Sequence, residues 1–176
     1  IPRKEEHTMG QRVHFLSTVN ARQVSKSEDG KSYIIRDVVG AVDGIVMNGM
    51  LYTGDELAKS VQTMAGKPAP AGHPKDKDGR HISALNGEAL AQAWIGAYCS
   101  DARHEGGRSM WTVVVNIAQA MAHEMGQKLC ARLEAAVNGE NVNPIDVSTG
   151  LQCIALAVNG ESGGKKYSRV ATQINY

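Results

Sequence analysis

The stretch PIDVSTGLQCIALAV, residues 144–158, begins with polar residues and continues as an apolar run. A second run, KYSRVATQINY (166–176), follows the segment NGESGGKK (159–166), which is rich in Gly and Asn. Two such runs on either side of turn-forming residues are typical of paired antiparallel strands. The sequence therefore predicts a strand, a loose hairpin turn and a strand at residues 144–176.

Further strands are predicted towards the N-terminus, because two long segments are rich in β-branched residues. These are RVHFLSTVNARQV (12–24) and SYIIRDVVGAVDGIVMNG (32–49), and the turn-like SKSEDGKS (25–32) between them predicts a long hairpin or meander. WIGAYCSDA (94–102) and SMWTVVVNI (109–117) are predicted as another strand pair, joined at HEGG (104–107).

Two segments have helical spacing. Thr53 and Glu56 have the form of a capping box, and Gly66 supplies a stop for a short helix with the apolar stripe Leu57, Val61 and Met64. Apolar residues then recur every fourth position, which predicts one amphipathic helix of about 20 residues packed on a sheet, with its Met stripe in the core and Asn138-Gly139 as its stop. The stripe is Ile117, Met121, Met125, Leu129, Leu133 and Val137.

The predicted strands come in hairpins and do not alternate with helices. This favours an α+β, mainly β fold, a barrel or sandwich with attached helices, over a doubly wound parallel sheet. The length of 176 residues fits a single domain over 1–176, with 1–11 as a flexible N-terminal segment. Because only 5% of the residues are aromatic, the core is expected to consist mainly of Val, Ile, Leu, Met and Ala.

Composition also excludes several classes of partner. The formal net charge is +1, from 19 basic and 18 acidic residues, so no strong field would gather nucleic acid or acidic lipid. No apolar run approaches the roughly 18 residues that a membrane span needs. Cys99, Cys130 and Cys153 lie in apolar surroundings, which predicts reduced thiols of a cytoplasmic protein and disfavours a cysteine nucleophile. No metal-ligand spacing is present, and no metal or other cofactor is expected.

Two residues stand out as candidates for chemistry. His73, in PAPAGHPKDKDGRH (68–81), follows a glycine, precedes a proline and adjoins a charged loop that predicts an accessible rim. Ser148 interrupts a strand, and Gly150 beside it would allow close approach of a substrate backbone. A serine becomes a nucleophile near neutral pH when an imidazole accepts its proton. Alternatively, His73 is a loop residue without a catalytic role, and Asp146, Ser148 and Thr149 form a turn before the strand.

The order of these motifs adds to this interpretation. The succession VMNGMLYTGDELAKSVQTMAGKPAPAGHP, WIGAY, the Ala-rich helix and VSTGL resembles the tailed-phage prohead (capsid-maturation) serine proteases, which share the fold of herpesvirus assemblin. The resemblance covers residues 33–176. It implies an assemblin-like β-barrel surrounded by helices, with His73 as general base and Ser148 as nucleophile. Backbone amides at Thr149 and Gly150 are candidates for the oxyanion site.

The third catalytic residue is not fixed by the resemblance. Related proteases orient the histidine with a second histidine or a carboxylate on the strand after the serine, and KYSRVATQINY contains neither. We expect that residue beyond Tyr176, in an Asp-His pair that relatives carry there, which would leave the chain as given weakly active. The alternatives within this chain are Glu161, Asp146 and His81.

The resemblance implies scaffolding and major capsid proteins as substrates, with self-cleavage, inside the prohead in the cytoplasm of the bacterial host. A homodimer is among the assembly states that it allows. One competing hypothesis is a catalytically idle, protease-like structural or scaffolding module of the phage head. Another is an unrelated small hydrolase, which the absence of a G-x-S-x-G elbow around Ser148 disfavours.

Overall fold

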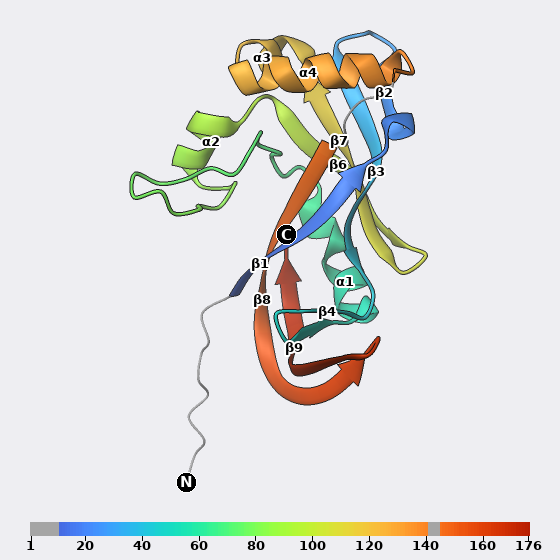
Figure 1. Cartoon of the computed structure of the whole chain (residues 1–176), viewed down its shortest axis with the longest axis vertical. Helices are drawn as coiled ribbons and strands as arrows, with labels where there is room; N and C mark the ends of the chain where they lie inside the picture. The colour runs from blue at the N-terminus through green and yellow to red at the C-terminus, as the bar shows by residue number, and fades with distance from the viewer. Residues whose placement is uncertain (1–10, 141–144) are drawn as a thin grey trace.

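The computed structural model describes residues 11–140 and 145–176, without the side chains of 11–14 and 21. The expected N-terminal segment 1–11 thus lies outside the described residues, except for Gln11. Figure 1 shows two β-sheets with helices at the periphery. One sheet has the strand order β1-β8-β9-β5-β4 and the other β2-β3-β7-β6. The strands are β1 (Gln11–Val19), β2 (Val24–Lys26), β3 (Ser32–Val42), β4 (Ile45–Met47), β5 (Met50–Tyr52), β6 (Ala97–Glu105), β7 (Arg108–Asn116), β8 (Ile145–Ser162) and β9 (Lys165–Asn175).

The predicted C-terminal hairpin is the longest feature of the five-stranded sheet. β8 and β9 are joined by Gly163 and Gly164 alone, both with positive φ (56° and 75°), which is the conformation of a tight hairpin turn. The expectation of a loose turn over 159–166 is therefore wrong, because the strands continue through most of it. The register between β8 and β9 shifts twice, and Figure 1 shows β8 as a strongly curved ribbon.

β8 is shared between two neighbours along its length. Its first half, Ile145 to Cys153, pairs antiparallel with β1, whereas Gln152 to Ser162 pairs antiparallel with β9. Within the described part of the chain, no strand pairs with the β9-side edge of residues 145–151. This half-open strand edge matters for the candidate site.

The predicted meander over 12–49 is divided between the two sheets. A short 3-10 turn, Ala21–Gln23, separates β1 in one sheet from β2 in the other, so 12–24 is not a single strand. The β2–β3 hairpin forms as predicted through the turn within 25–32, and the β6–β7 hairpin forms as predicted at Gly106-Gly107.

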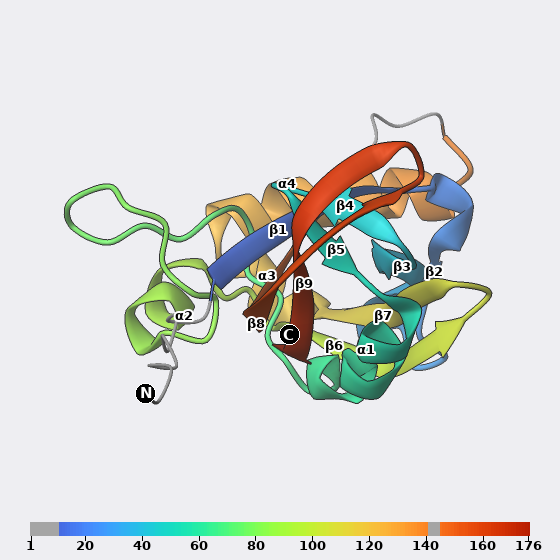
Figure 2. The same cartoon turned by 90° about the horizontal axis from the view of Figure 1, so that it is seen from below.

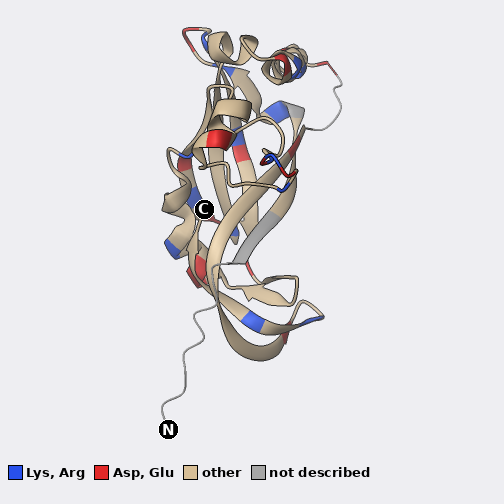
Figure 3. Cartoon of the chain, turned by 90° about the vertical axis from the view of Figure 1, so that its left-hand side faces the viewer, with Lys and Arg blue, Asp and Glu red and all other residues tan. Residues whose placement is uncertain are grey.

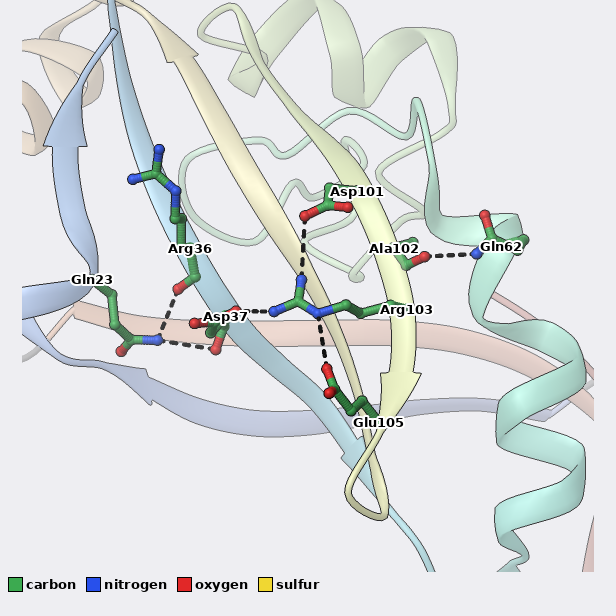
Figure 4. Close-up of polar contacts among 8 residues, drawn as sticks. All are labelled: Gln23, Arg36, Asp37, Gln62, Asp101, Ala102, Arg103 and Glu105. Atoms are coloured by element: carbon green, nitrogen blue, oxygen red, sulfur yellow. Dashed lines mark hydrogen bonds and ion pairs between the residues drawn. The ribbon is translucent and has the colours of Figure 1, made fainter.

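Two of the β-bulges in the four-stranded sheet are held by one arginine. They lie at Asp37 in β3 and Asp101 in β6, whose φ values are 55° and 48°. Figure 4 shows the Arg103 guanidinium reaching across the intervening strand β7 to the Asp37 carboxylate. Arg103 also lies 3.3 Å from an Asp101 oxygen and 3.6 Å from a Glu105 oxygen. These carboxylates raise the pKa of Arg103, led by the hydrogen bond to Asp37.

Glutamine side chains bind the carbonyls beside these bulges (Figure 4). Gln23 Nε2 donates to the carbonyl oxygens of Arg36 and Asp37 at 2.8 and 3.0 Å. Gln62 Nε2 donates to the carbonyl of Ala102 at 2.6 Å. Carbonyls near a disrupted ladder thus find side-chain donors, as buried or half-buried backbone groups generally must.

The helices differ from expectation in three ways. α1 (Gly54–Ser60) continues as a 3-10 turn to Met64 and buries the predicted stripe, but Thr53 makes no side-chain capping bond, so the capping box is not formed. α2 (Gly87–Ala93) was not predicted; the Asn86 side chain caps it by accepting from the amide of Glu88. The predicted long helix is divided into α3 (Ile117–Met121) and α4 (Glu124–Val137).

The break between α3 and α4 has a packing reason. A Cβ at Gly126 would lie 2.0 Å from the carbonyl oxygen of Ala120, so the two helices approach backbone to backbone. The buried face of α4 consists of small residues and one leucine: Gly126, Cys130, Leu133 and Ala136. Met121 and Met125 are 47% and 52% exposed, so the expectation that the Met stripe is core is wrong. The predicted stop is correct, with Asn138 as C-cap and Gly139 at φ 75°.

The core lies between the two sheets. Its largest fully buried side chains include Trp111, Tyr52 and Met50, and Trp111 contacts Tyr176 edge-on at 5.5 Å between ring centroids. From the composition we expected a core of Val, Ile, Leu, Met and Ala. Most of the core is aliphatic, but aromatic residues lie at its centre. Figure 2 shows α1 near the C-terminal end of β9, where the amide of Gln173 donates to a Glu56 carboxylate oxygen of α1 at 3.1 Å. The predicted α+β, mainly β class is confirmed.

Charged residues are spread along the molecule. In Figure 3, Lys and Arg alternate with Asp and Glu over loops, helices and strands. No helix within residues 11–140 and 145–176 is long and apolar enough to cross a membrane.

Candidate active site

A cavity of about 610 Å³ lies beside the first half of β8. Its walls come from β8, α4, the segment 67–85 and the four-stranded sheet. It brings together six of the predicted site residues, four from β8 and two from the histidine loop: Asp146, Ser148, Thr149, Gly150, His73 and His81. Glu161 does not line it.

The segment leading to His73 is held against the edge of β6 and the end of α2. The amides of Ala69 and Ala71 donate to the carbonyls of Ala97 and Ala93, both at 2.9 Å, and the amide of Cys99 donates to Lys67. Pro68 and Pro70 occupy the alternate positions, where no amide donor is needed. The sequence KPAPAG thus forms an extended edge that delivers the histidine to the cavity.

The loop after His73 folds back on itself. Gly72 has φ 84°, a conformation that side-chain-bearing residues rarely adopt, and Pro74 is buried. Lys75 pairs with His81 in an isolated bridge, and the amide of Ile82 donates to the Pro74 carbonyl at 3.0 Å. An Asp76 oxygen accepts from the amides of Asp78 and Arg80, both at 2.9 Å, which fixes the charged turn.

This fold-back places two imidazoles side by side. The rings of His73 and His81 lie edge to face, with centroids 5.3 Å apart and planes at 83°. Both side chains are exposed, so the predicted accessible rim is confirmed. The eight-residue separation of the two histidines does not by itself indicate this contact, because it depends on the turn at Asp76.

Ser148 lies within β8, three residues after its start. Asp146 and Thr149 belong to β8 as well, so the alternative that Asp146, Ser148 and Thr149 form a turn before the strand is wrong. Alternation along the strand puts the half-buried Ser148 and the exposed Asp146 and Gly150 on one face, and Thr149 on the core face. Thr149 is 3% exposed, and its hydroxyl has no hydrogen-bond partner among the described residues.

The three candidates for the third catalytic residue lie in different places. Asp146 lines the cavity, and one of its carboxylate oxygens accepts from the Thr18 hydroxyl at 3.3 Å. Glu161 lies near the far end of β8, opposite Lys166 in β9. Of the candidates in this chain, His81 is the one in ring contact with His73.

Cations predominate around the cavity. Its lining contains three formally positive side chains, Lys67, Lys128 and Arg132, and one carboxylate, Asp146. Lys128 and Arg132 lie four residues apart, on one face of α4.

A serine–histidine–carboxylate array lies away from this cavity, and sequence reasoning missed it. His104 Nε2 lies 3.1 Å from an Asp43 oxygen, and His104 Nδ1 lies 3.1 Å from Ser109 Oγ. A proton on Nε2 donates to the carboxylate, and the serine hydroxyl then donates to Nδ1. Ser109 is fully buried at 0% exposure, so a peptide carbonyl cannot reach it. This array links the β6–β7 hairpin to the β3–β4 turn.

The thiols have the character predicted for them. Cys99, Cys130 and Cys153 are buried and unpaired. Burial raises the pKa of all three, and that of Cys99, which lines the cavity, to about 12. A thiol held in its neutral form is a weak nucleophile, so cysteine chemistry at this cavity is disfavoured. In the described parts of the chain, no three His, Cys, Asp or Glu residues are grouped as metal ligands would be.

The fold is similar to that of a solved structure. The chain is similar to the capsid assembly protease gp21 of bacteriophage T4, with a TM-score of 0.55 and 15% sequence identity, over 96% of this chain and 94% of the other. No protein-family model matches the sequence. A search among curated proteins also finds no match. The resemblance to a phage capsid protease is therefore confirmed at the level of the fold.

Proposed function

We propose that the protein is a serine endopeptidase of phage capsid maturation. It cleaves scaffolding and major capsid proteins, and itself, inside the prohead in the cytoplasm of the bacterial host. The observation that carries this proposal is the cavity that His73 and Ser148 line together, in a chain whose fold is similar to that of a capsid assembly protease. The two residues are 75 positions apart (148 − 73) and belong to different elements.

In the proposed reaction, His73 accepts the hydroxyl proton of Ser148 as Oγ attacks the carbonyl carbon of the peptide bond. The C–N bond of the tetrahedral intermediate then breaks, and His73 returns the proton to the leaving amine. Water, deprotonated by His73, hydrolyses the acyl-enzyme and regenerates the serine. Backbone amides around Thr149 and Gly150 would stabilise the oxyanion.

His81 is proposed as the positioning residue for His73. Its ring lies 5.3 Å from that of His73 and meets it edge to face, which restricts the orientation of the imidazole. An unoriented histidine loses much of its catalytic value. The expected Asp-His pair beyond Tyr176 stays a prediction and would supply a further partner.

The half-open strand edge of β8 supports a peptide as the substrate. Residues 145–151 pair with β1 on one edge only, in the part of the chain that the structure describes. Every second residue of that segment therefore directs its amide and carbonyl to the open side. An extended polypeptide can add there as a strand, which would bring its backbone alongside Ser148.

A fluorophosphonate probe tests the nucleophile without knowledge of the substrate, because it phosphonylates activated serines. We expect the probe to modify Ser148, as located by peptide mass spectrometry, and the labelling rate to fall about 10²–10⁴-fold in His73→Ala. Ser148→Ala should remove the label. For His81, the Ala variant should label at least about tenfold more slowly and the Gln variant at an intermediate rate, with equal thermal midpoints.

Ser109→Ala is the matched control, because it removes the serine of the buried array. It should leave labelling at Ser148 intact. Co-expression with the scaffold should give trimmed chains in wild type and whole chains in Ser148→Ala. Equal labelling in wild type and His73→Ala would contradict the assigned base. A folded wild type that is unlabelled and leaves the scaffold whole would favour the idle structural module.

A further inference from the structure

We infer that Leu16, Leu85 and Met125 form an apolar subsite beside Ser148 that binds a large apolar side chain of the cleaved polypeptide. The inference rests on the proposed function, since the bound group is a side chain of the proposed substrate. It assigns specificity to residues that the sequence did not single out as site residues.

Leu16 is the central member of this subsite. It lies in β1 directly opposite Ser148 in the antiparallel register, so the two side chains lie on the same face of the sheet. Directly opposed residues have Cβ atoms roughly 4.5–5.5 Å apart. An acyl group that reaches Ser148 Oγ therefore also lies close to Leu16. Yet the residue is 80% exposed, so it contributes little to the core.

The other two members come from separate elements. Met125 belongs to α4 and is 52% exposed, and Leu85 precedes α2 and is 49% exposed. Both line the same cavity as Leu16 and Ser148. On α4, Leu129 follows Met125 by one turn and lines the cavity too, which continues the apolar surface towards the core. Three parts of the fold thus present exposed apolar side chains to the same cavity.

This convergence differs from the other exposed apolar residues. Ile154, Leu156 and Val158 lie on the far half of β8 and do not line the cavity. Single exposed apolar residues are common and need no explanation, but a group gathered around a candidate nucleophile indicates a ligand-binding surface. The neighbouring half-open edge of β8 makes an extended polypeptide the fitting occupant.

The test uses Ser148→Ala, which can bind but not cleave, to select from a displayed library of random peptides. We expect the selected peptides to share a large apolar residue, Leu, Met or Phe, at one position. Adding Leu16→Asp should raise the dissociation constant of a selected peptide about tenfold or more, because one lost apolar contact in a pocket has this effect. Met125→Glu should act in the same direction.

Leu156→Asp is the matched control, an exposed leucine of the same sheet away from the cavity. It should change the dissociation constant less than about twofold, as expected for a surface substitution. Thermal midpoints of all variants should agree. Selection without an apolar consensus, no selection at all, or equal binding in Leu16→Asp and Leu156→Asp would overturn the subsite. If wild type labels at Ser148 while selection fails, the proposed function stands and the subsite alone is wrong.

Discussion

Gly40 lies in β3 beneath the ring of Trp111, and the space there admits no side chain. A Cβ at Gly40 would lie 1.7 Å from Trp111 Cη2, with two more ring atoms at 2.4 and 2.5 Å. The ring is 2% exposed and packs on Tyr176, so it cannot move aside without disturbing the centre of the core. We expect Gly40→Ala to lower the free energy of unfolding by about 3 kcal/mol, as strong overpacking does. Urea denaturation measures this.

Gly87→Ala is the control for this substitution. Gly87 opens α2, has no positive φ, and a Cβ there would meet nothing within 4 Å. It should leave stability unchanged or raise it slightly, because alanine favours helix over glycine. If Gly40→Ala lowered the free energy of unfolding no more than Gly87→Ala does, the packing argument would be contradicted.

Some residues of the candidate site could be identified from the sequence, and others could not. His73 and Ser148 were identifiable because GHP and STG interrupt regular patterns. His81 and Leu16 were not identifiable as neighbours of these two residues, since one depends on a folded turn and the other on strand register. The Asp43–His104–Ser109 array was missed for the same reason: its members meet only through tertiary pairing.

Among the elements, α4 is anchored to the β2–β3 hairpin by Glu134. Lys26 Nζ lies 2.7 Å from one of its carboxylate oxygens, and the Tyr33 hydroxyl donates to the same oxygen. The Lys26 hydrogen bond, followed by that of Tyr33, lowers the pKa of Glu134 below its ordinary 4.5. Because the folded pKa is the lower one, this contribution to stability is present above the unfolded pKa and is lost as the pH falls through the folded pKa.

Glu134→Gln therefore has a pH-dependent effect. It should lower the thermal midpoint relative to wild type at pH 7, and the difference should shrink as the pH falls below about 4.5. Thermal melts from pH 7 to 3 measure both curves. Glu124→Gln is the control, because Glu124 pairs with Lys128 of the same helix and, among the described residues, with no other element. A wild-type to Glu134→Gln difference that is independent of pH would contradict an ionised Glu134 as the anchor.

Elements with local signals were the ones that sequence predicted well. The β2–β3 and β6–β7 turns, the α1 stripe and the end of α4 all follow from nearby Gly, Asn or apolar spacing. The division at Ala122-His123 did not follow, because it depends on Gly126 packing against the Ala120 carbonyl. The exposure of Met125 also escaped prediction: apolar periodicity marks a helix face but does not say whether a core or a cavity lies against it.

At the scale of the whole molecule, hairpin-rich composition was enough to predict a mainly β fold. It could not assign β1 and β2 to different sheets, since no local signal tells which distant strand each one joins. β1 pairs with β8, more than 125 residues later, and that pairing places Leu16 beside Ser148. Long-range register therefore determines the candidate site and lies beyond local pattern.

The three thiols can report whether the predicted single domain unfolds as one unit. Cys99 lies in the four-stranded sheet, Cys153 in the five-stranded sheet and Cys130 in α4, all within one hydrophobic core. Because burial raises the pKa of each, few thiolates exist at pH 8 in the native protein. We expect Ellman's reagent to modify less than one thiol per native chain, three in guanidinium, and all three with one rate at intermediate denaturant. Rapid modification of Cys99 alone would instead mean that the cavity opens to the reagent without unfolding, and two separate rates would contradict a single cooperative domain.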